Sequence, residues 1–471
     1  MKKEVYNPYL PGWEYIADGE PHIFGDRLYI FGSHDRAGGS DYCMNDYVGW
    51  STPLTDLSEW KYEGIVYPRT AHPHEGDLPF YFAPDVAQGL DGRYYLYYSV
   101  KDSSILSVAV CDTPVGRYEY LGDVHFQDGR VLGASPDDWY QFDPSVLVDI
   151  DGRIWLYSGS GQELNMEHGH PVMGCLVMEL ESDMLTIRKG PKQILPAKES
   201  LEEPNFFEGA SARHIGEWYY LIYPATNLTG LNYAMSRYPD RDFEHKGIIH
   251  CTSDIGYEGR GIGQLRYPVG NYHGGLVCIE GQWYIFDHRQ TNRTFFSRQG
   301  VAERIHINDD GTIDMVETTS CGLNGGPLCG KGEYPAYIAC NLMGETVDGN
   351  RDPFGGPYIT QDEPDYEPEK GGIEPVPYVA GIANGCVVGY KYFNLQGITN
   401  TKLSIRGKAA GTIDILVEEE GAVLGKLDIQ LDCELWETVE IPVAELNGIS
   451  AVYIRFEGKG SFSLKTVEFG K

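Results

Sequence analysis

The chain of 471 residues carries one short pattern five times. Each copy begins with a polar residue, passes through a short apolar segment into a turn that contains glycine, and ends in an aromatic-rich segment. The copies are Asp18 to Tyr29, Asp85 to Tyr95, Asp143 to Trp155, Glu208 to Tyr219 and His273 to Tyr284. Two extended segments joined by a tight turn with glycine are typical of a β-hairpin. The pattern therefore predicts five equivalent hairpins.

The spacing of the copies indicates how the hairpins are arranged. Their closing aromatic residues stand at positions 29, 95, 155, 219 and 284, so successive copies lie 66, 60, 64 and 65 residues apart. A nearly constant period built from strands and turns is typical of sheets repeated around an axis. We therefore predict a five-bladed β-propeller, with about four strands in each blade and the innermost strand of each blade lining a central channel. The first residue of each copy then lies at the channel mouth.

The remaining sequence predicts a second domain. A chain of this length exceeds the roughly 250 to 300 residues at which a single core usually stops growing. We assign residues 1–315 to the propeller, the Gly- and Cys-rich residues 316–332 to a linker, and residues 333–471 to a β-sandwich of jelly-roll type. Short alternating runs without the repeat, such as those at 401–406 and 451–456, favour a sandwich. The acid-rich loop at 362–370 is expected to be a solvated excursion.

Charge and composition exclude some classes of binding partner and indicate the cellular compartment. The chain has 37 basic and 69 acidic residues, a net charge of −32, which repels nucleic acid and anionic membrane surfaces. No apolar run approaches the roughly 18 residues of a membrane span, and the start MKKEVYNPYLPGW lacks the apolar core of a signal peptide. Ten scattered cysteines without a Cys-x-x-Cys pair favour free thiols. We therefore expect a soluble, cytoplasmic protein.

The polar residues that open the copies suit acid and base chemistry on a neutral substrate. Asp18, Asp143 and Glu208 supply three carboxyls, and His273 supplies an imidazole. Glycoside hydrolysis needs one protonated carboxyl to assist the leaving oxygen and one ionised carboxylate to activate water or attack carbon. A third acid raises the pKa of the proton donor, because like charges disfavour double ionisation. Asp85 is interpreted as structural, since an Asp at a strand start commonly bonds its own backbone.

Over residues 7–315 the chain resembles glycoside hydrolase family 43. The matching segments, in order, are NPYLPGWEYIADGEPHIFGDRLYIFGSHD, FAPDV, FDPSVLVDIDGRIWLY, FFEGASARHIGEWYYLIY and NYHGGLVCIEGQWYIFDHRQTN. The resemblance implies a five-bladed propeller that cleaves arabinofuranosyl or xylosyl bonds with inversion. It also implies a catalytic role for three residues, with Asp18 as the general base, Asp143 as the acid that tunes pKa and orients substrate, and Glu208 as the general acid.

The same resemblance implies the residues around the three acids. His273 matches a channel histidine beside a structural calcium ion, which it contacts mostly through water. Phe82 and Arg298 are the implied substrate contacts. One position departs from the family pattern, because Gly19 and Glu20 follow Asp18 where Pro and Ser are usual. Residues two apart on a strand share a face, so Glu20 is a further substrate-binding candidate and an alternative to Asp18 as the base.

Residues 333–471 resemble the carbohydrate-binding modules of family 6 that often follow such propellers. We expect an exo-acting, inverting hydrolase that removes terminal α-L-arabinofuranosyl or β-D-xylosyl units from plant-derived oligosaccharides, as in xylan degradation. Two alternatives remain. One is hydrolysis of another neutral sugar, such as galactan, on the same fold. The other is a carbohydrate-binding protein that has lost catalysis through the change after Asp18.

Overall fold

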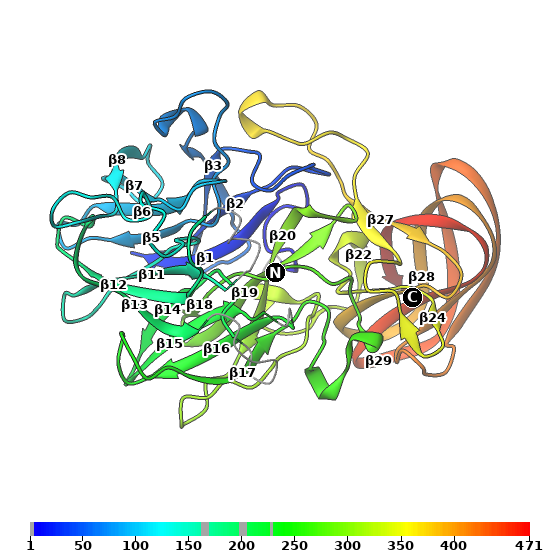
Figure 1. The fold of residues 1–471 in the computed structure, drawn as a ribbon. Coiled ribbons are helices and arrows are strands. Elements are labelled where there is room, and N and C mark those ends of the chain that lie inside the picture. The colour runs from blue at the N-terminus through cyan, green and yellow to red at the C-terminus, as the bar shows by residue number, and fades with distance from the viewer. Residues whose placement is uncertain (1–3, 162–168, 197–204, 227–228) are drawn as a thin grey trace.

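The computed structural model describes residues 4–161, 169–196, 205–226 and 229–471. It is an all-β structure in which a five-bladed propeller is followed by a β-rich C-terminal domain (Figure 1). All ten cysteines lie among the described residues and are free thiols. Within those ranges, no helix has the length and apolar character that crossing a membrane requires. The predicted fold class is confirmed.

Five sheets form the blades, and all their pairings are antiparallel except that of β9 with β13. Blade 1 contains β1 (Ile16–Phe24), β2 (Arg27–His34), β3 (Tyr47–Pro53) and β4 (Lys61–Tyr67). Blade 2 contains β5 (Asp85–Gln88), β6 (Tyr94–Ser99), β7 (Leu106–Cys111) and β8 (Glu119–Asp123). Blade 3 contains β10 (Ser145–Val148), β11 (Ile154–Ser160), β12 (Gly174–Leu180) and β13 (Thr186–Pro196), with β9 (His125–Phe126) pairing in parallel with β13. Blade 4 contains β14 (Ser211–Ile215), β15 (Trp218–Pro224), β16 (Leu231–Ser236) and β17 (Glu244–His250). Blade 5 contains β18 (Leu276–Ile279), β19 (Gln282–Thr291) and β20 (Thr294–Ile305).

The predicted hairpins join the first two strands of every blade. Their turns contain Gly25, Gly92, Gly152, Gly216 and Gly281, all of which have φ between 64° and 86°. A side chain strains the backbone in this left-handed region, whereas glycine adopts it freely. The repeated glycine is therefore a requirement of the turn, which is why the repeat is visible in sequence.

The inner strands of each blade are buried on both faces, because each blade packs between two neighbours. In β6, Tyr98 packs toward blade 1 with Tyr47, whereas the adjacent Tyr97 packs toward blade 3 with Leu156. Equivalent apolar clusters fill the other interfaces, and the cluster around Ile30 and Phe286 joins blade 5 to blade 1. A parallel bridge between Gly19 and Gly274 adds a backbone link at this closure. The ring is thus closed by packing and holds its innermost strands around one axis.

The C-terminal domain is built on one seven-stranded sheet. It contains β21 (Leu328–Cys329), β22 (Gly332–Pro335), β23 (Asn341–Met343), β26 (Tyr358–Thr360), β27 (Tyr378–Ile382), β28 (Val387–Leu416) and β29 (Gly425–Gly470). A separate hairpin joins β24 (Thr346–Val347) to β25 (Asn350–Arg351). The very long β28 and β29 bend through several pairings, and residues 400–416 pair with 425–442 on one side and 453–470 on the other. Within the predicted linker, β21 already pairs with β28.

Helical structure among the described residues is confined to short 3-10 turns. They are η1 (Arg69–Ala71), η3 (Tyr257–Gly259), η4 (Ile262–Gln264), η5 (Gly322–Asn324), η6 (Ala336–Ile338) and η7 (Pro368–Lys370).

The acid-rich loop at 362–370 does not behave as a solvated excursion. Asp365 accepts hydrogen bonds from Ala37 and Asn45, and Tyr366 packs edge-on against Trp13. Figure 1 shows this yellow segment extending from the C-terminal domain toward blade 1. The sequence interpretation is therefore wrong for its centre, because the hydrogen-bonding groups that receive these acidic residues lie more than 300 positions away in the chain.

Candidate active site

The residues that open the repeats stand at the beginning of the innermost strands. Asp18 lies in β1, whereas Asp143, Glu208 and His273 each come two or three residues before the innermost strand of their blade. A bulge interrupts the β1–β2 pairing between Ala17 and Glu20. Asp18 has φ of 55° and Asp143 has φ of 43°, in the left-handed region that non-glycine residues seldom occupy. Such backbone conformations cost free energy and cluster at functional sites, where they aim a side chain.

His273 is the point at which three of the predicted residues meet. Its Nδ1 lies 3.9 Å from Asp18 Oδ1 and 3.9 Å from Asp143 Oδ2. Its Nε2 lies 3.8 Å from Glu20 Oε1. The imidazole therefore separates two groups of acids, with Asp18 and Asp143 on one side and Glu20 on the other.

Arg298 holds Asp18 in its ionised form. Its Nη1 donates to both carboxylate oxygens of Asp18, at 2.9 and 3.1 Å, and its Nε donates to Asp35 Oδ2 at 2.7 Å. Burial is the largest single influence and opposes ionisation of Asp18, but the charge of Arg298, together with smaller contributions from His288, His273 and Ser33, lowers the pKa of Asp18 to about 2. Asp18 is therefore an acceptor of protons at neutral pH.

His288 fixes the backbone at Asp18. The N–H of Asp18 donates to His288 Nδ1 at 3.1 Å, and His288 Nε2 lies 3.1 Å from Asn271 Oδ1. Burial lowers the pKa of His288 to about 3, so the ring is neutral near pH 7. A neutral ring with a proton on Nε2 satisfies both contacts. Arg298 is consequently the charge that keeps Asp18 ionised.

Asp143 and Glu208 form an electrostatically coupled pair. Burial, followed by the charges of Glu208 and Asp18, holds the pKa of Asp143 well above its ordinary value. Asp143 is 5% exposed, and its Oδ1 is buried without a hydrogen-bond partner in the structure. Glu208 is followed by Gly209, where a Cβ would lie 3.0 Å from the His273 ring. Asp143 therefore favours its protonated form beside an ionised Asp18, so the site holds both a proton-bearing and an ionised carboxyl.

Aromatic side chains surround the acids at the channel mouth. The Phe82 ring lies 5.3 Å from Phe142 and 6.4 Å from Tyr42, which is 4.7 Å from Phe296. The Arg298 guanidinium lies 4.9 Å from the Tyr42 ring. These rings are half-buried, so their apolar faces can pack against a sugar ring.

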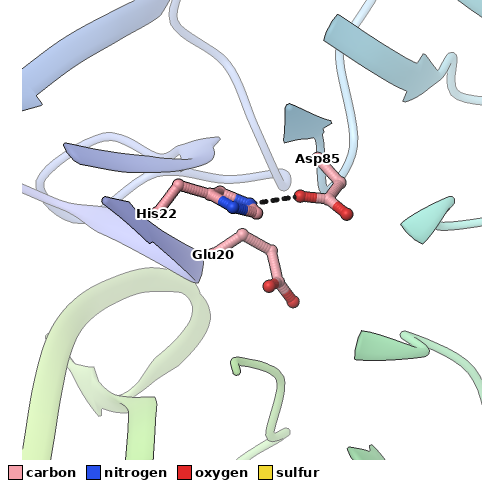
Figure 2. Close-up of side chains that lie close together, drawn as sticks. All are labelled: Glu20, His22 and Asp85. Atoms are coloured by element: carbon pink, nitrogen blue, oxygen red, sulfur yellow. Dashed lines mark hydrogen bonds and ion pairs between the residues drawn. The ribbon is translucent and has the colours of Figure 1, made fainter. Parts of the chain in front are cut away.

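On the far side of His273, Glu20 belongs to a polar cluster in the channel. Its Oε2 accepts hydrogen bonds from Arg213 at 2.7 Å and Ser211 at 3.0 Å, whereas its Oε1 is buried without one. Figure 2 shows Glu20 and His22 projecting from β1, with the His22 ring directed at the Asp85 carboxylate. His22 Nε2 lies 2.6 Å from Asp85 Oδ1 of β5. Asp85 Oδ2 also accepts the N–H of Val146 in blade 3. Asp85 thus links three blades, which agrees with its structural interpretation.

Three residues that shape the site were missed by sequence reasoning. Asp35 follows β2 directly and anchors Arg298, His288 contacts the Asp18 backbone, and Arg213 neutralises Glu20. Arg213 carried a usable signal, since it stands two positions after Ser211 on an innermost strand, whose alternate side chains face the channel. Asp35 and His288 act through partners remote in sequence, so no local pattern marks them.

A propeller with one ionised and one proton-bearing carboxyl beneath an aromatic rim defines a glycoside hydrolase. A family model described as glycosyl hydrolases family 43 matches residues 50–313. A xylosidase/arabinosidase from Thermoclostridium stercorarium is 42% identical over 480 aligned positions, covering 99% of each chain. The chain belongs to glycosyl hydrolase family 43.

Solved structures share this architecture. An arabinoxylan arabinofuranohydrolase from Bacillus subtilis, in complex with cellotetraose, covers 99% of this chain and 97% of its own, with 19% identity and a TM-score of 0.51. A β-xylosidase/α-arabinofuranosidase from a compost microbial metagenome was solved with xylotriose in a calcium-free form. It is 25% identical and covers 64% of this chain and 95% of its own, with a TM-score of 0.52. The similarity to the first structure extends over both domains. The similarity to the second covers a share of this chain that corresponds to the propeller alone.

Proposed function

We propose that this protein is an exo-acting, inverting glycosidase that releases terminal α-L-arabinofuranosyl or β-D-xylosyl units from plant-derived oligosaccharides. One observation carries the proposal: Asp18 and Asp143 both lie beside the imidazole of His273, and Arg298 keeps Asp18 ionised. The activity named for the relative with 42% identity over the whole chain supports the choice of sugars.

In the proposed reaction, Asp18 accepts a proton from a water molecule, whose oxygen bonds to the anomeric carbon from the face opposite the leaving group. Glu208 gives its proton to the glycosidic oxygen as the carbon–oxygen bond breaks. Asp143 and Glu208 repel each other when both are ionised, so the presence of Asp143 favours a protonated Glu208. One water is consumed, and the configuration at the anomeric carbon inverts.

Asp18, and not Glu20, is the base in this proposal. Glu20 lies across His273 from Asp143, and one of its oxygens is held by Arg213 and Ser211. Its contribution to substrate binding would therefore be indirect. Phe82 supplies an apolar face for the sugar. Arg298 directs its donors to Asp18, Asp35 and Cys43, so it acts on the substrate by orienting the base.

The channel residues fit a structural calcium ion beside His273. Glu20 Oε1 is a buried carboxylate oxygen without a hydrogen-bond partner, and it lies 3.8 Å from His273 Nε2. Calcium prefers oxygen ligands, so Glu20 would bind it directly and His273 through water. The ion would offset the negative charge of the channel acids. Metal analysis of the purified protein, with and without chelator and with Glu20→Gln as the comparison, tests this site.

Two further proposals concern the whole protein. A sugar-binding role for the C-terminal domain, as in carbohydrate-binding modules of family 6, is favoured by a groove lined by Arg406, Lys408, Asp432 and Phe462. Titration of xylo-oligosaccharides into a catalytically inactive variant with and without Lys408→Ala tests it. A cytoplasmic location, with imported oligosaccharides as substrates, agrees with ten free thiols.

Nitrophenyl glycosides of arabinofuranose and xylose test the catalytic proposal. We expect turnover by the wild type and a loss of at least about 100-fold in Glu208→Ala, since a positioned acid contributes about 10² to 10⁴. Glu217→Ala is the matched control, because this exposed glutamate lies in the hairpin turn of the same blade. Absence of turnover in all three proteins, with oligosaccharide binding retained, would instead support the non-catalytic alternative.

A further inference from the structure

We propose that the C-terminal domain holds part of the active site in place, through a strap (residues 361–369) that fastens a loop of blade 1 (residues 35–45), with Asp365 as the positioning residue. The proposal rests on the proposed function, because the blade-1 loop carries groups that contact Arg298 and so act on the catalytic base. It assigns the C-terminal domain a role in turnover that is separate from sugar binding.

Asp365 joins the two ends of the blade-1 loop. Its Oδ1 accepts the N–H of Ala37 at 2.9 Å, and its Oδ2 accepts Nδ2 of Asn45 at 3.0 Å. The Arg36 guanidinium lies 3.9 Å from the same Oδ2. The carboxylate is 17% exposed, so these contacts are partly shielded from water. Hydrogen bonds to a charged acceptor are about twice as strong as neutral ones.

The strap is anchored on blade 1 by contacts that do not involve Asp365. Tyr366 packs edge-on against Trp13 at 4.7 Å, and the Tyr15 hydroxyl donates to Gln361 Oε1 at 2.8 Å. Tyr62 donates to Glu369 near the far end of the strap. Because these anchors are independent, removal of the Asp365 carboxylate should leave the strap docked and release only the blade-1 loop.

A chain of contacts leads from this loop to the proposed base. Asn45 Nδ2 also donates to the Asp35 carbonyl at 2.8 Å, and the N–H of Cys43 donates to Asp35 Oδ1 at 3.0 Å. Asp35 Oδ2 in turn accepts a hydrogen bond from Arg298 Nε at 2.7 Å, and Arg298 Nη1 donates to the Asp18 carboxylate. Loosening the loop would therefore misplace the pair that keeps Asp18 ionised.

The tests use the full chain with Asp365→Ala, Asp365→Asn and the matched control Glu363→Ala, an exposed acid of the same strap. We expect Asp365→Ala to lower kcat/KM at least about tenfold, mainly through kcat, since small misplacements of catalytic groups are costly. The acid limb of its pH profile should also move to higher pH. Asp365→Asn retains one acceptor oxygen, so its kcat/KM should lie between those of the wild type and Asp365→Ala. The kcat/KM of Glu363→Ala should match that of the wild type.

Hydrogen exchange supplies a readout that needs no turnover. Peptides covering residues 35–45 should exchange faster in Asp365→Ala, while peptides from the strap itself keep their wild-type rates. Unchanged exchange in residues 35–45 would overturn the proposal, and so would faster exchange with unaltered kcat/KM and an unmoved acid limb. If the wild type shows no glycosidase turnover, the proposed function fails, and the exchange difference alone decides whether the strap holds the loop.

Discussion

Replacing Arg298 by lysine probes the electrostatics of the proposed base. Arg298 spans Asp18 and Asp35 with separate nitrogens of one planar group. Lysine carries a compact charge on a single nitrogen and cannot make both sets of hydrogen bonds. The variant keeps the net charge of the site, so any change reports the loss of the bridging geometry.

The size of the effect follows from the pKa of Asp18. The lowering from 3.8 to about 2 corresponds to roughly 2 kcal/mol favouring the ionised form. This lowering exists although burial acts in the opposite direction, so a lysine whose ammonium lies farther from the Asp18 carboxylate should let the pKa of Asp18 rise toward 3.8. Because the folded-state pKa is depressed, the associated stability is present above about pH 4 and is lost as the pH falls toward 2. The variant should lack most of it at neutral pH.

The assay is kcat/KM for a nitrophenyl glycoside between pH 3.5 and 7. We expect the wild type to show no acid limb above about pH 4, whereas Arg298→Lys should decline across this range as Asp18 takes up a proton. Arg93→Lys alters an exposed arginine–carboxylate pair and should follow the wild type. Coinciding acid limbs for Arg298→Lys and the wild type would refute the reasoning that Arg298 keeps the base ionised.

Three further substitutions test separate parts of the structure. Asp143→Asn removes a carboxyl that repels ionised Glu208, so the alkaline limb of the pH profile of kcat/KM should move to lower pH. An unmoved limb would contradict the electrostatic interaction between Asp143 and Glu208. His22→Ala removes the contact that links the buried Asp85 to blade 1, while Asp85 keeps its hydrogen bonds from Val86 and Val146. Urea unfolding should show a loss of about 1 kcal/mol, and unchanged stability would show that this link does not stabilise the fold. Gly275→Ala places a Cβ 2.6 Å from Glu20 Oε2, so we expect a loss of about 1 to 3 kcal/mol from crowding, whereas wild-type stability would show that the channel relaxes freely.

The sequence was sufficient for the propeller because the features that specify a blade are local. Each hairpin turn needs a glycine with positive φ, and the inner strands are buried between neighbouring blades, so every blade repeats the same short pattern. The period then follows from the number of residues in a blade. The same regularity places Asp18, Asp143 and His273 at equivalent positions, and in the structure His273 Nδ1 lies 3.9 Å from a carboxylate oxygen of each of the two acids.

What the sequence could not supply are contacts between residues remote in the chain. The ionisation of Asp18 depends on Arg298, 280 positions away, and Arg298 depends on Asp35. The strap shows the same limitation, since its acidic composition predicts solvation and only the fold reveals the hydrogen-bond donors that Asp365 meets. Local composition reports what a segment can do, whereas its partners are decided by tertiary packing.

The stereochemistry of hydrolysis tests the central claim most directly. Proton NMR of the first sugar released from nitrophenyl α-L-arabinofuranoside or β-D-xyloside distinguishes inversion from retention before the product mutarotates. We expect β-L-arabinose or α-D-xylose as the first product, because Asp18 activates water opposite the leaving group. Release of the retained anomer would show that a carboxylate attacks the sugar directly and would contradict the account.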